Sequence, residues 1–88
     1  MRGNLWGGGA VAFVYRYYDA IGQLLYVGIT SENPLNRDRQ HRHAAPWYSE
    51  VARYSWQAYP GRTDALRAEA EAIATEAPLY NVAGGYLR

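Results

Sequence analysis

A glutamate that helical spacing directs toward the protein interior is the residue in this sequence that most needs a chemical explanation. Glu69 falls in a helix expected over residues 64–77, three residues after Leu66 and four before Ile73. It therefore lies at the edge of an expected apolar stripe of Leu66, Ala70, Ile73 and Ala77. A carboxylate that faces a core is costly unless it is paired or binds a metal ion. Glu71, four residues after Arg67, needs no such explanation because an exposed ion pair is natural there.

An arginine-rich segment supplies the second set of chemically capable side chains. Asn33-Pro34 is a typical helix start, and the helix should run to His43 or Ala45. Two pairs with a spacing of four residues each share a face of this helix: Arg37 with His41, and Arg39 with His43. All nine basic residues of the chain are arginine, which suits bidentate phosphate contacts. Leu35 is the only large apolar residue of the helix, so the helix is either a solvated element or one whose polar face is used.

Two tyrosines stand in the middle of the two strands of an expected β-hairpin. The strands are residues 11–18, with Tyr15, and residues 24–29, with Tyr26. A two- or four-residue loop centred on Ala20-Ile21 would set Tyr15 directly opposite Tyr26. A three-residue loop with a bulge at Gly22 would send the rings to opposite faces of the sheet, unless a second irregularity compensates. The pattern does not choose between these loops, and a shared site requires both rings on one face.

The remaining pattern completes a small α+β domain. Residues 52–58 alternate between apolar and polar side chains, which is the period of a third strand. The expected fold is a small three-stranded antiparallel sheet, the hairpin plus this strand, flanked by helices. The 88 residues suffice for one domain with a modest core. We expect a flexible leader over residues 1–10, the domain over 11–82 and a tail over 83–88.

Composition excludes several other classes of protein. The chain has no cysteine, so it has neither disulfides nor a thiolate metal site, and two histidines alone cannot build a structural zinc site. No apolar run approaches the ~18 residues of a membrane span, and no signal-peptide pattern is present. We therefore expect a soluble cytoplasmic protein. The net charge of +1 argues against strong non-specific binding of nucleic acid. Evidence for nucleic-acid binding must therefore come from the positions of the arginines and not from their number.

The ordered set of these features resembles the GIY-YIG nuclease superfamily over residues 11–82. The matching segments are Phe13-Val14-Tyr15, Tyr26-Val27-Gly28, Arg37 with His41, Glu69, and Pro78-Leu79-Tyr80-Asn81. Each motif is weak alone, but five in the right order and spacing are strong. The family spacing selects Glu69 independently of the helical pattern. The sequence departs from the family in having Phe13 where the first motif has glycine. Arg39 competes with Arg37 for the arginine position, and the short interval from His41 to Pro46-Trp47 favours Arg37.

The resemblance implies a metal-dependent DNA endonuclease that hydrolyses phosphodiester bonds. In this interpretation Glu69 holds one Mg²⁺ or Mn²⁺ ion. Arg37 stabilises charge on the phosphate, Tyr15 is the favoured general base, and Tyr26 and His41 surround the nucleophilic water. A free tyrosine has a pKa of about 10, so nearby arginine and metal charge would have to lower it. Asn81 is expected to have a supporting, orienting role. Candidates for contacts with the DNA backbone are Arg39, Arg42 and Arg53.

Two alternatives to an active nuclease remain open. The same fold can be a catalytically silent module that binds nucleic acid or a protein, and the intact set of motif residues argues against that. A small tyrosine-rich interaction domain would have no Mg²⁺-dependent activity and no salt-dependent DNA binding. Because the domain has no room for a separate recognition module, we expect either weak or low-specificity cutting by the isolated domain or a partner protein that supplies targeting. Repair, recombination, restriction and mobile-element roles all occur on this fold, and the fold does not select among them.

Overall fold

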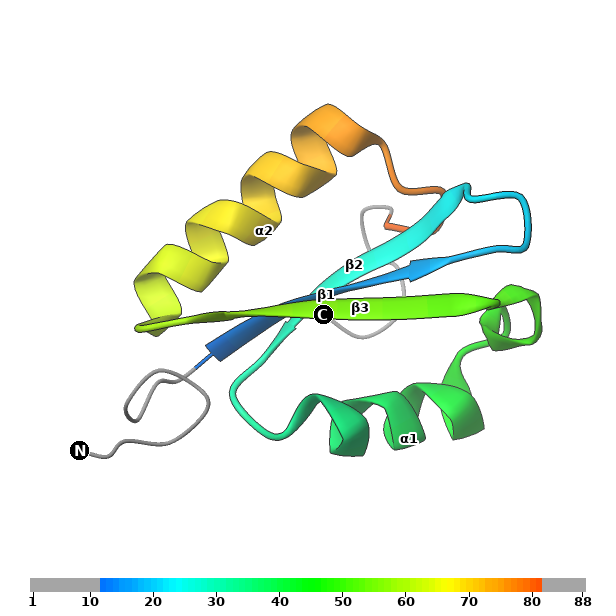
Figure 1. Ribbon diagram of the computed structural model, residues 1–88, viewed down its shortest axis with the longest axis horizontal. Helices are drawn as coiled ribbons and strands as arrows, with labels where there is room; N and C mark the ends of the chain where they lie inside the picture. The colour runs from blue at the N-terminus through cyan, green and yellow to red at the C-terminus, as the bar shows by residue number, and fades with distance from the viewer. Residues whose placement is uncertain (1–11, 82–88) are drawn as a thin grey trace.

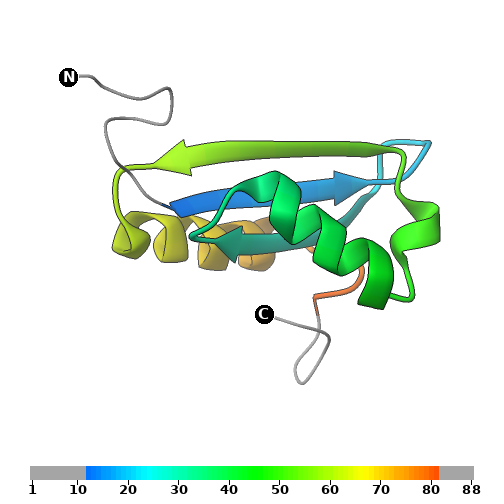
Figure 2. The same cartoon turned by 90° about the horizontal axis from the view of Figure 1, so that it is seen from below.

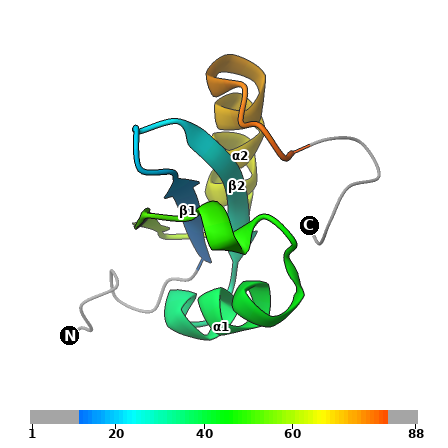
Figure 3. The ribbon, with the colours of Figure 1, turned by 90° about the vertical axis from the view of Figure 1, so that its right-hand side faces the viewer.

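The computed structural model describes residues 12–81, which form a three-stranded antiparallel sheet with one helix on each side (Figure 1 and Figure 3). The elements are β1 (Ala12–Tyr18), β2 (Leu24–Thr30), α1 (Pro34–Ala44), a 3₁₀ helix (Tyr48–Glu50), β3 (Arg53–Tyr59) and α2 (Arg62–Glu76). The strand order is β2-β1-β3, so β1 is central. The α+β class and the flanked three-stranded sheet are therefore confirmed. The leader expected over residues 1–10 and the tail expected over 83–88 lie outside the described residues.

Alternation along β1 gives the sheet two chemically different faces. The face toward α2 is aliphatic, and its buried residues are Ala12, Val14, Val27, Ile29, Ala65 and Ala72. The face toward α1 is aromatic, and its buried residues are Tyr15, Tyr17, Leu25, Tyr26, Ala45 and Trp47. We refer to these sets as the aliphatic core and the aromatic core. Because successive strand residues point to opposite faces, one central strand contributes to both.

The hairpin loop contains three residues and a bulge at Gly22. The N–H of Gly22 donates to the carbonyl of Asp19 at 3.1 Å, and that of Asp19 donates to the carbonyl of Gln23 at 2.9 Å. Gly22 has a φ of 90°, in the region that favours glycine. The carboxylate of Asp19 accepts from the N–H groups of Ile21 and Gln23, which closes the loop. The even-length loop is therefore not the one this hairpin uses.

A second irregularity brings the two tyrosines back to one face. Tyr18 pairs with Leu24, but Tyr17 pairs with Tyr26, so the ladder steps past Leu25. This shift offsets the one at the loop, and Tyr15 and Tyr26 both join the aromatic core. The two are not directly opposite each other, because Tyr15 pairs with Gly28. The shared face is therefore achieved through the compensating irregularity.

The ring of Tyr15 lies directly over Gly28 of β2. A Cβ atom on Gly28 would collide with the hydroxyl oxygen and with ring carbons of Tyr15. Both residues are buried, and Tyr15 has only 1% of its surface exposed. The glycine of the second motif is thus required by close approach of a cross-strand ring, and not by its backbone conformation.

α2 faces the sheet with a different stripe from the one expected. The helix begins at Arg62 after Gly61 and ends at Glu76, and its buried residues are Ala65, Glu69 and Ala72. Leu66, expected to point inward, has 43% of its surface exposed. The stripe prediction was wrong because alanine, which allows a helix to pack closely, forms the inward face here. As a result Glu69 lies in the middle of the buried stripe and not at its edge.

The segment after α2 completes the outer edge of β2. The N–H groups of Leu79 and Tyr80 donate to the carbonyls of Leu24 and Leu25 at 3.2 and 2.8 Å. The side chain of Asn81 binds both backbone groups of Val27, accepting at 2.7 Å and donating at 2.8 Å. The side-chain amide of Asn81 therefore makes the two hydrogen bonds to Val27 that a neighbouring β-strand would otherwise make. Within residues 12–81, neither helix has the length and apolar character needed to cross a membrane.

The contact between Tyr15 and Gly28 predicts an effect on stability. Gly28→Ala should lower the free energy of unfolding by about 1–3 kcal/mol, since overpacking displaces a buried ring. Chemical denaturation of Gly28→Ala, Tyr15→Ala and the double variant measures the coupling between the two positions. Gly61→Ser is the control, because a Cβ at Gly61 meets nothing within 4 Å. Additive effects of the two substitutions would contradict the proposed clash.

Candidate functional site

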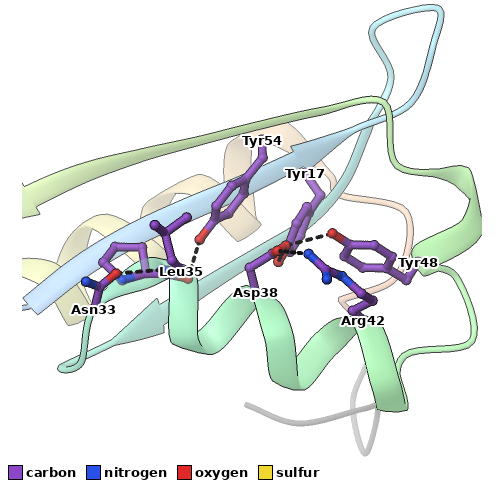
Figure 4. Close-up of polar contacts among 8 residues, drawn as sticks. Tyr17, Asn33, Leu35, Asp38, Arg42, Tyr48 and Tyr54 are labelled. Carbon is purple, nitrogen blue, oxygen red and sulfur yellow. Dashed lines mark hydrogen bonds and ion pairs between the residues drawn. The ribbon is translucent and has the colours of Figure 1, made fainter.

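α1 docks on the aromatic core through its polar side. The helix begins at Pro34, as predicted, with the side chain of Asn33 accepting from the N–H of Leu35 at 2.8 Å. The hydroxyl of Tyr54 donates to the carbonyl of Pro34 at 2.8 Å. Further along, the carboxylate of Asp38 accepts from tyrosine hydroxyls (Figure 4). The helix lies across one face of the sheet (Figure 2). The alternative in which the polar face is used is thus the correct one.

The hydroxyl of Tyr15 is the meeting point of the central strand and α1. It lies 2.6 Å from Nε2 of His41 and accepts from Nε of Arg37 at 3.3 Å. His41 is fully buried and Arg37 is partly buried. Arg39, the other arginine considered for this position, is exposed. The spacing of four residues therefore brings Arg37 and His41 together on one phenol.

Burial controls the protonation of this pair. Burial raises the pKa of Tyr15, and the hydrogen bond and charge of Arg37 oppose that shift only in part. Burial also lowers the pKa of His41 to about 4, with a further lowering by Arg37. At neutral pH both groups are therefore neutral. The sequence interpretation required arginine and metal charge together to lower the pKa of Tyr15, and Arg37 by itself lowers this pKa by less than desolvation raises it.

The protonation states assign the direction of the Tyr15–His41 hydrogen bond. Tyr15 is a neutral phenol whose oxygen already accepts from Arg37, so its own proton is available to donate. Nε2 of the neutral His41 is the acceptor at 2.6 Å. We therefore assign the imidazole proton to Nδ1. Arg37 thus donates a hydrogen bond to Tyr15, and Tyr15 in turn donates one to His41.

Tyr26 is held beside Tyr15 and His41 by aromatic packing. Its ring centroid is 5.3 Å from that of His41 and 6.3 Å from that of Tyr15. Trp47 stacks on the ring of Tyr26 at 4.9 Å with an interplanar angle of 25° and also contacts His41, at 5.6 Å between ring centroids. Tyr80 in turn stacks on Trp47 at 6.0 Å. We call Tyr15, Tyr26, Arg37 and His41 the phenol cluster, and sequence spacing identified each of its members.

Glu69 belongs to the opposite layer of the fold. It lies on α2, among residues of the aliphatic core, with 1% of its surface exposed. Its charge nevertheless raises the pKa of Tyr15, so the carboxylate is within electrostatic range of the phenol. The inward placement expected from the sequence is met. A charge this deeply buried costs stability, which is consistent with a functional reason for keeping it.

The available side-chain ligands suit a magnesium ion whose coordination shell is completed by oxygens of the substrate. Among residues 12–81, no group of three or more His, Asp or Glu side chains could hold a metal. Mg²⁺ is commonly bound through one or two carboxylates, with waters and phosphate oxygens as its other ligands. Glu69 has one carboxylate, the type of group from which such a site would take its protein ligand. The residues therefore fit a metal shared with a phosphate, and not an all-protein cage.

The three arginines considered for contacts with the DNA backbone differ in position. Arg39 and Arg42 are exposed on α1, and Arg42 contacts Asp38 at 3.3 Å. Arg53 pairs with Tyr18 across β1 and β3, and its guanidinium lies 4.0 Å over the ring of Tyr18. Tyr18 and Tyr15 differ by an odd number of positions, so Arg53 is on the other face of the sheet. The structure brings Arg39 and Arg42 to the helix of the phenol cluster, but it does not bring Arg53 there.

Sequence reasoning missed Asp38. This residue appeared only as one of many charges on a polar helix, yet its carboxylate accepts from Tyr17, Tyr48 and Arg42. The available signal was the helix itself: a helix without an apolar stripe, facing a strand of tyrosines, needs acceptors for their hydroxyls. Arg42 lies on the same helix, but Tyr17 and Tyr48 come from other elements, so no sequence spacing identifies these two partners.

The lowered pKa of His41 predicts a pH-dependent stability. An unfolded histidine has a pKa of about 6.5, so between about pH 4 and 6.5 the unfolded chain binds more protons. The free energy of unfolding should therefore rise with pH across this interval, by about 3 kcal/mol from this residue. Urea denaturation at several pH values should show that His41→Gln loses this part of the dependence. His43→Gln, at an exposed position, is the control, and equal slopes in both variants would contradict the prediction.

Comparison with known proteins places the chain in a family. No curated protein and no solved structure matches it. A family model described as the GIY-YIG catalytic domain matches residues 11–81. The match spans β1 to Asn81 and so includes the phenol cluster, Glu69 and the edge contact of Asn81. The chain belongs to the GIY-YIG family of nuclease domains.

Proposed function

We propose that the protein is a divalent-metal-dependent endonuclease that hydrolyses phosphodiester bonds in DNA. The observation that carries the proposal is the buried hydroxyl of Tyr15, which is bound at once by Arg37 and His41. A phenol between a fixed cation and a neutral imidazole has a clear use in proton transfer. Membership of the family supports the same reaction class.

Arg37 has the position and chemistry of a phosphate-binding residue. Its Nε is engaged with Tyr15, while its NH1 donates to the exposed side chain of Gln40 at 2.6 Å. A phosphate oxygen that replaces Gln40 would gain a charge-assisted hydrogen bond. The guanidinium would then offset the negative charge that develops on phosphorus oxygens in the transition state. The contact with Tyr15 would hold the phosphate beside the phenol.

Tyr15 and His41 together can accept the proton of an attacking water. Tyr15 alone is a poor base, because burial raises its pKa and keeps it protonated. In the proposed step the water proton moves to the oxygen of Tyr15 as the proton of Tyr15 moves to Nε2 of His41. The water oxygen bonds to phosphorus, and the bond to the leaving oxygen breaks. The leaving oxygen keeps the bonding electron pair and takes up a proton from solvent. His41 is the final proton acceptor, and the phenol is its relay.

Glu69 is the residue that would hold the metal ion. When bound, a divalent cation supplies charge stabilisation to phosphate oxygens and lowers the pKa of bound water. The remaining ligands would be waters and oxygens of the DNA, which agrees with the single carboxylate available. Tyr26 completes the cluster by packing against His41 and limits access of bulk water to the relay.

Charge distribution supports approach of DNA from the α1 side. α1 carries three arginines and one aspartate, whereas α2 carries two arginines and four carboxylates. The helices lie on opposite sides of the sheet (Figure 1 and Figure 3). The α1 side is therefore the more favourable side for the approach of a polyanion, and Glu69 does not oppose this because its carboxylate is buried. The near-neutral total charge makes a targeting partner a reasonable requirement for tight binding.

Cleavage assays test the proposed reaction. Purified protein should nick plasmid or branched DNA with Mg²⁺ or Mn²⁺ and should not do so with EDTA. Glu69→Gln and Arg37→Ala should each reduce the rate by roughly 100-fold or more, since each removes transition-state charge stabilisation. Glu71→Gln and Arg67→Ala are matched controls at exposed positions of α2 and should cleave at the wild-type rate.

Two outcomes would contradict the proposal in different ways. Equal nicking by the wild type, Glu69→Gln and Arg37→Ala would mean that the site is wrongly assigned. Salt-dependent DNA binding without cleavage of any substrate would instead favour a catalytically silent binding module on the same fold.

The charge argument predicts which helix contacts DNA. In EDTA, Arg39→Glu should weaken DNA binding, and the slope of log affinity against log salt should become less steep by about 0.9 for the lost phosphate contact. Fluorescence anisotropy with a labelled oligonucleotide measures both quantities. Arg67→Glu makes the same change on α2, where the side chain is exposed, and should leave the slope unchanged. A larger effect from Arg67→Glu would place DNA on the α2 side.

A further inference from the structure

We propose that Asp38 is a positioning residue for the proposed nuclease reaction: it fixes the rotation of α1 so that Arg37 and His41 both meet Tyr15. This inference rests on the proposed function for its catalytic consequence. Its structural part, the fixed rotation of the helix, stands on the contacts of Asp38 alone. Those contacts lie outside the phenol cluster and are shown in Figure 4.

The carboxylate of Asp38 joins three elements of the fold. Its Oδ1 accepts from the hydroxyl of Tyr17 in β1 at 2.8 Å and from that of Tyr48 in the 3₁₀ helix at 2.9 Å. Its Oδ2 lies 3.3 Å from NH2 of Arg42, one turn further along α1. The side chain of Asp38 is only 13% exposed, whereas that of Arg42 is 60% exposed. Asp38 is therefore anchored mainly by the two tyrosines.

This anchor acts where α1 has little else to hold it. The helix has no apolar stripe, and the buried residues it contributes are Pro34 and His41. The bond from Tyr54 to the carbonyl of Pro34 holds its first turn. Asp38 holds the next turn and lies between Arg37 and His41 in the sequence. A small rotation of the helix would move both of these residues away from Tyr15, since side chains on one helix turn together.

Asp38 also bears on the charge balance of His41. The titratable and charged groups around His41 are Tyr15 and Tyr17 from β1, Tyr26 from β2, and Arg37 and Asp38 from its own helix. Asp38 raises the pKa of His41, opposing burial and Arg37. Its loss should therefore make His41 a weaker proton acceptor, in addition to loosening the helix.

The decisive experiment separates DNA binding from cleavage in Asp38→Ala. Alanine removes both carboxylate oxygens, whereas the amide oxygen of asparagine could still accept from Tyr17 and Tyr48. The substitution removes a negative charge from the basic side of the molecule, so affinity for an oligonucleotide in EDTA should stay equal or become tighter. The cleavage rate at saturating enzyme should fall by roughly tenfold or more, because small misplacement of reacting groups is costly. Asp64→Ala removes the same charge from an exposed position on α2 and should change neither quantity.

The two alternatives to a positioning role give different patterns. If Asp38 were only a surface charge, Asp38→Ala would raise binding and leave cleavage at saturation unchanged, which would overturn the proposal. If it only stabilised the fold, binding and cleavage would fall together with the folded fraction, measured by circular dichroism, and this too would overturn it. Should Asp38→Ala fail to fold, Tyr48→Phe deletes one contact to Oδ1, and unchanged cleavage in that variant would overturn the proposal.

A spectroscopic measurement keeps this inference distinct from the proposed function. The ¹H and ¹³C resonances of the His41 ring, assigned with His43→Gln, report its pKa and surroundings in the absence of DNA. Asp38→Ala should shift the resonances of His41 and lower its pKa, and Asp64→Ala should not. If no DNA is cleaved but these shifts occur, the nuclease proposal fails and the positioning of α1 by Asp38 stands. If the resonances of His41 are unchanged, the positioning proposal fails even for an active enzyme.

Discussion

Docking of a charged helix onto a sheet of tyrosines is the constraint on which the rest of this structure depends. α1 has no apolar stripe, so area burial cannot hold it in place. Tyrosine solves this problem because its ring fills the aromatic core while its hydroxyl binds a polar group on the helix. Four such hydroxyls, from Tyr15, Tyr17, Tyr48 and Tyr54, contact α1. Each buried hydroxyl left without a partner would cost about 1–3 kcal/mol, so the set specifies one docked position.

The two faces of the sheet divide stability and chemistry between them. The aliphatic core under α2 buries small side chains without polar partners, and it is the ordinary stabilising half of the fold. The aromatic core under α1 uses the same side chains for packing and for the phenol cluster. Glu69 is the exception, a buried carboxylate on the stabilising side. Glu69 was recognisable in the sequence because helical spacing places this carboxylate on the face of α2 that points toward the core.

Elements with strong local signals were predictable, and features set by contacts between elements were not. Asn33-Pro34 determines the start of α1, and the spacing of Arg37 and His41 follows from helix geometry. The register of the hairpin depends on two irregularities, at Gly22 and at Leu25, whose effects cancel, and a pattern with period two reveals neither. The inward face of α2 was predicted wrongly because the prediction was based on the hydrophobicity of Leu66. Hydrophobicity alone does not take into account that alanine side chains allow a helix to pack closely against a sheet. The role of Asp38 could not be predicted from the sequence because two of its partners lie on other elements.

The electrostatics of the phenol cluster give the proposed enzyme a reason to be inactive without substrate. In the free protein, Arg37 lowers the pKa of His41 and burial lowers it further, so the imidazole is a weak proton acceptor. A phosphate bound to Arg37 would neutralise that cation and add negative charge nearby, and both changes raise the pKa of His41. Proton acceptance by His41 would therefore be favoured only when DNA is present. In the proposed reaction, the buried, neutral pair of Tyr15 and His41 would therefore act as a proton relay that becomes effective when substrate binds, and Tyr15 would not have to be ionised beforehand.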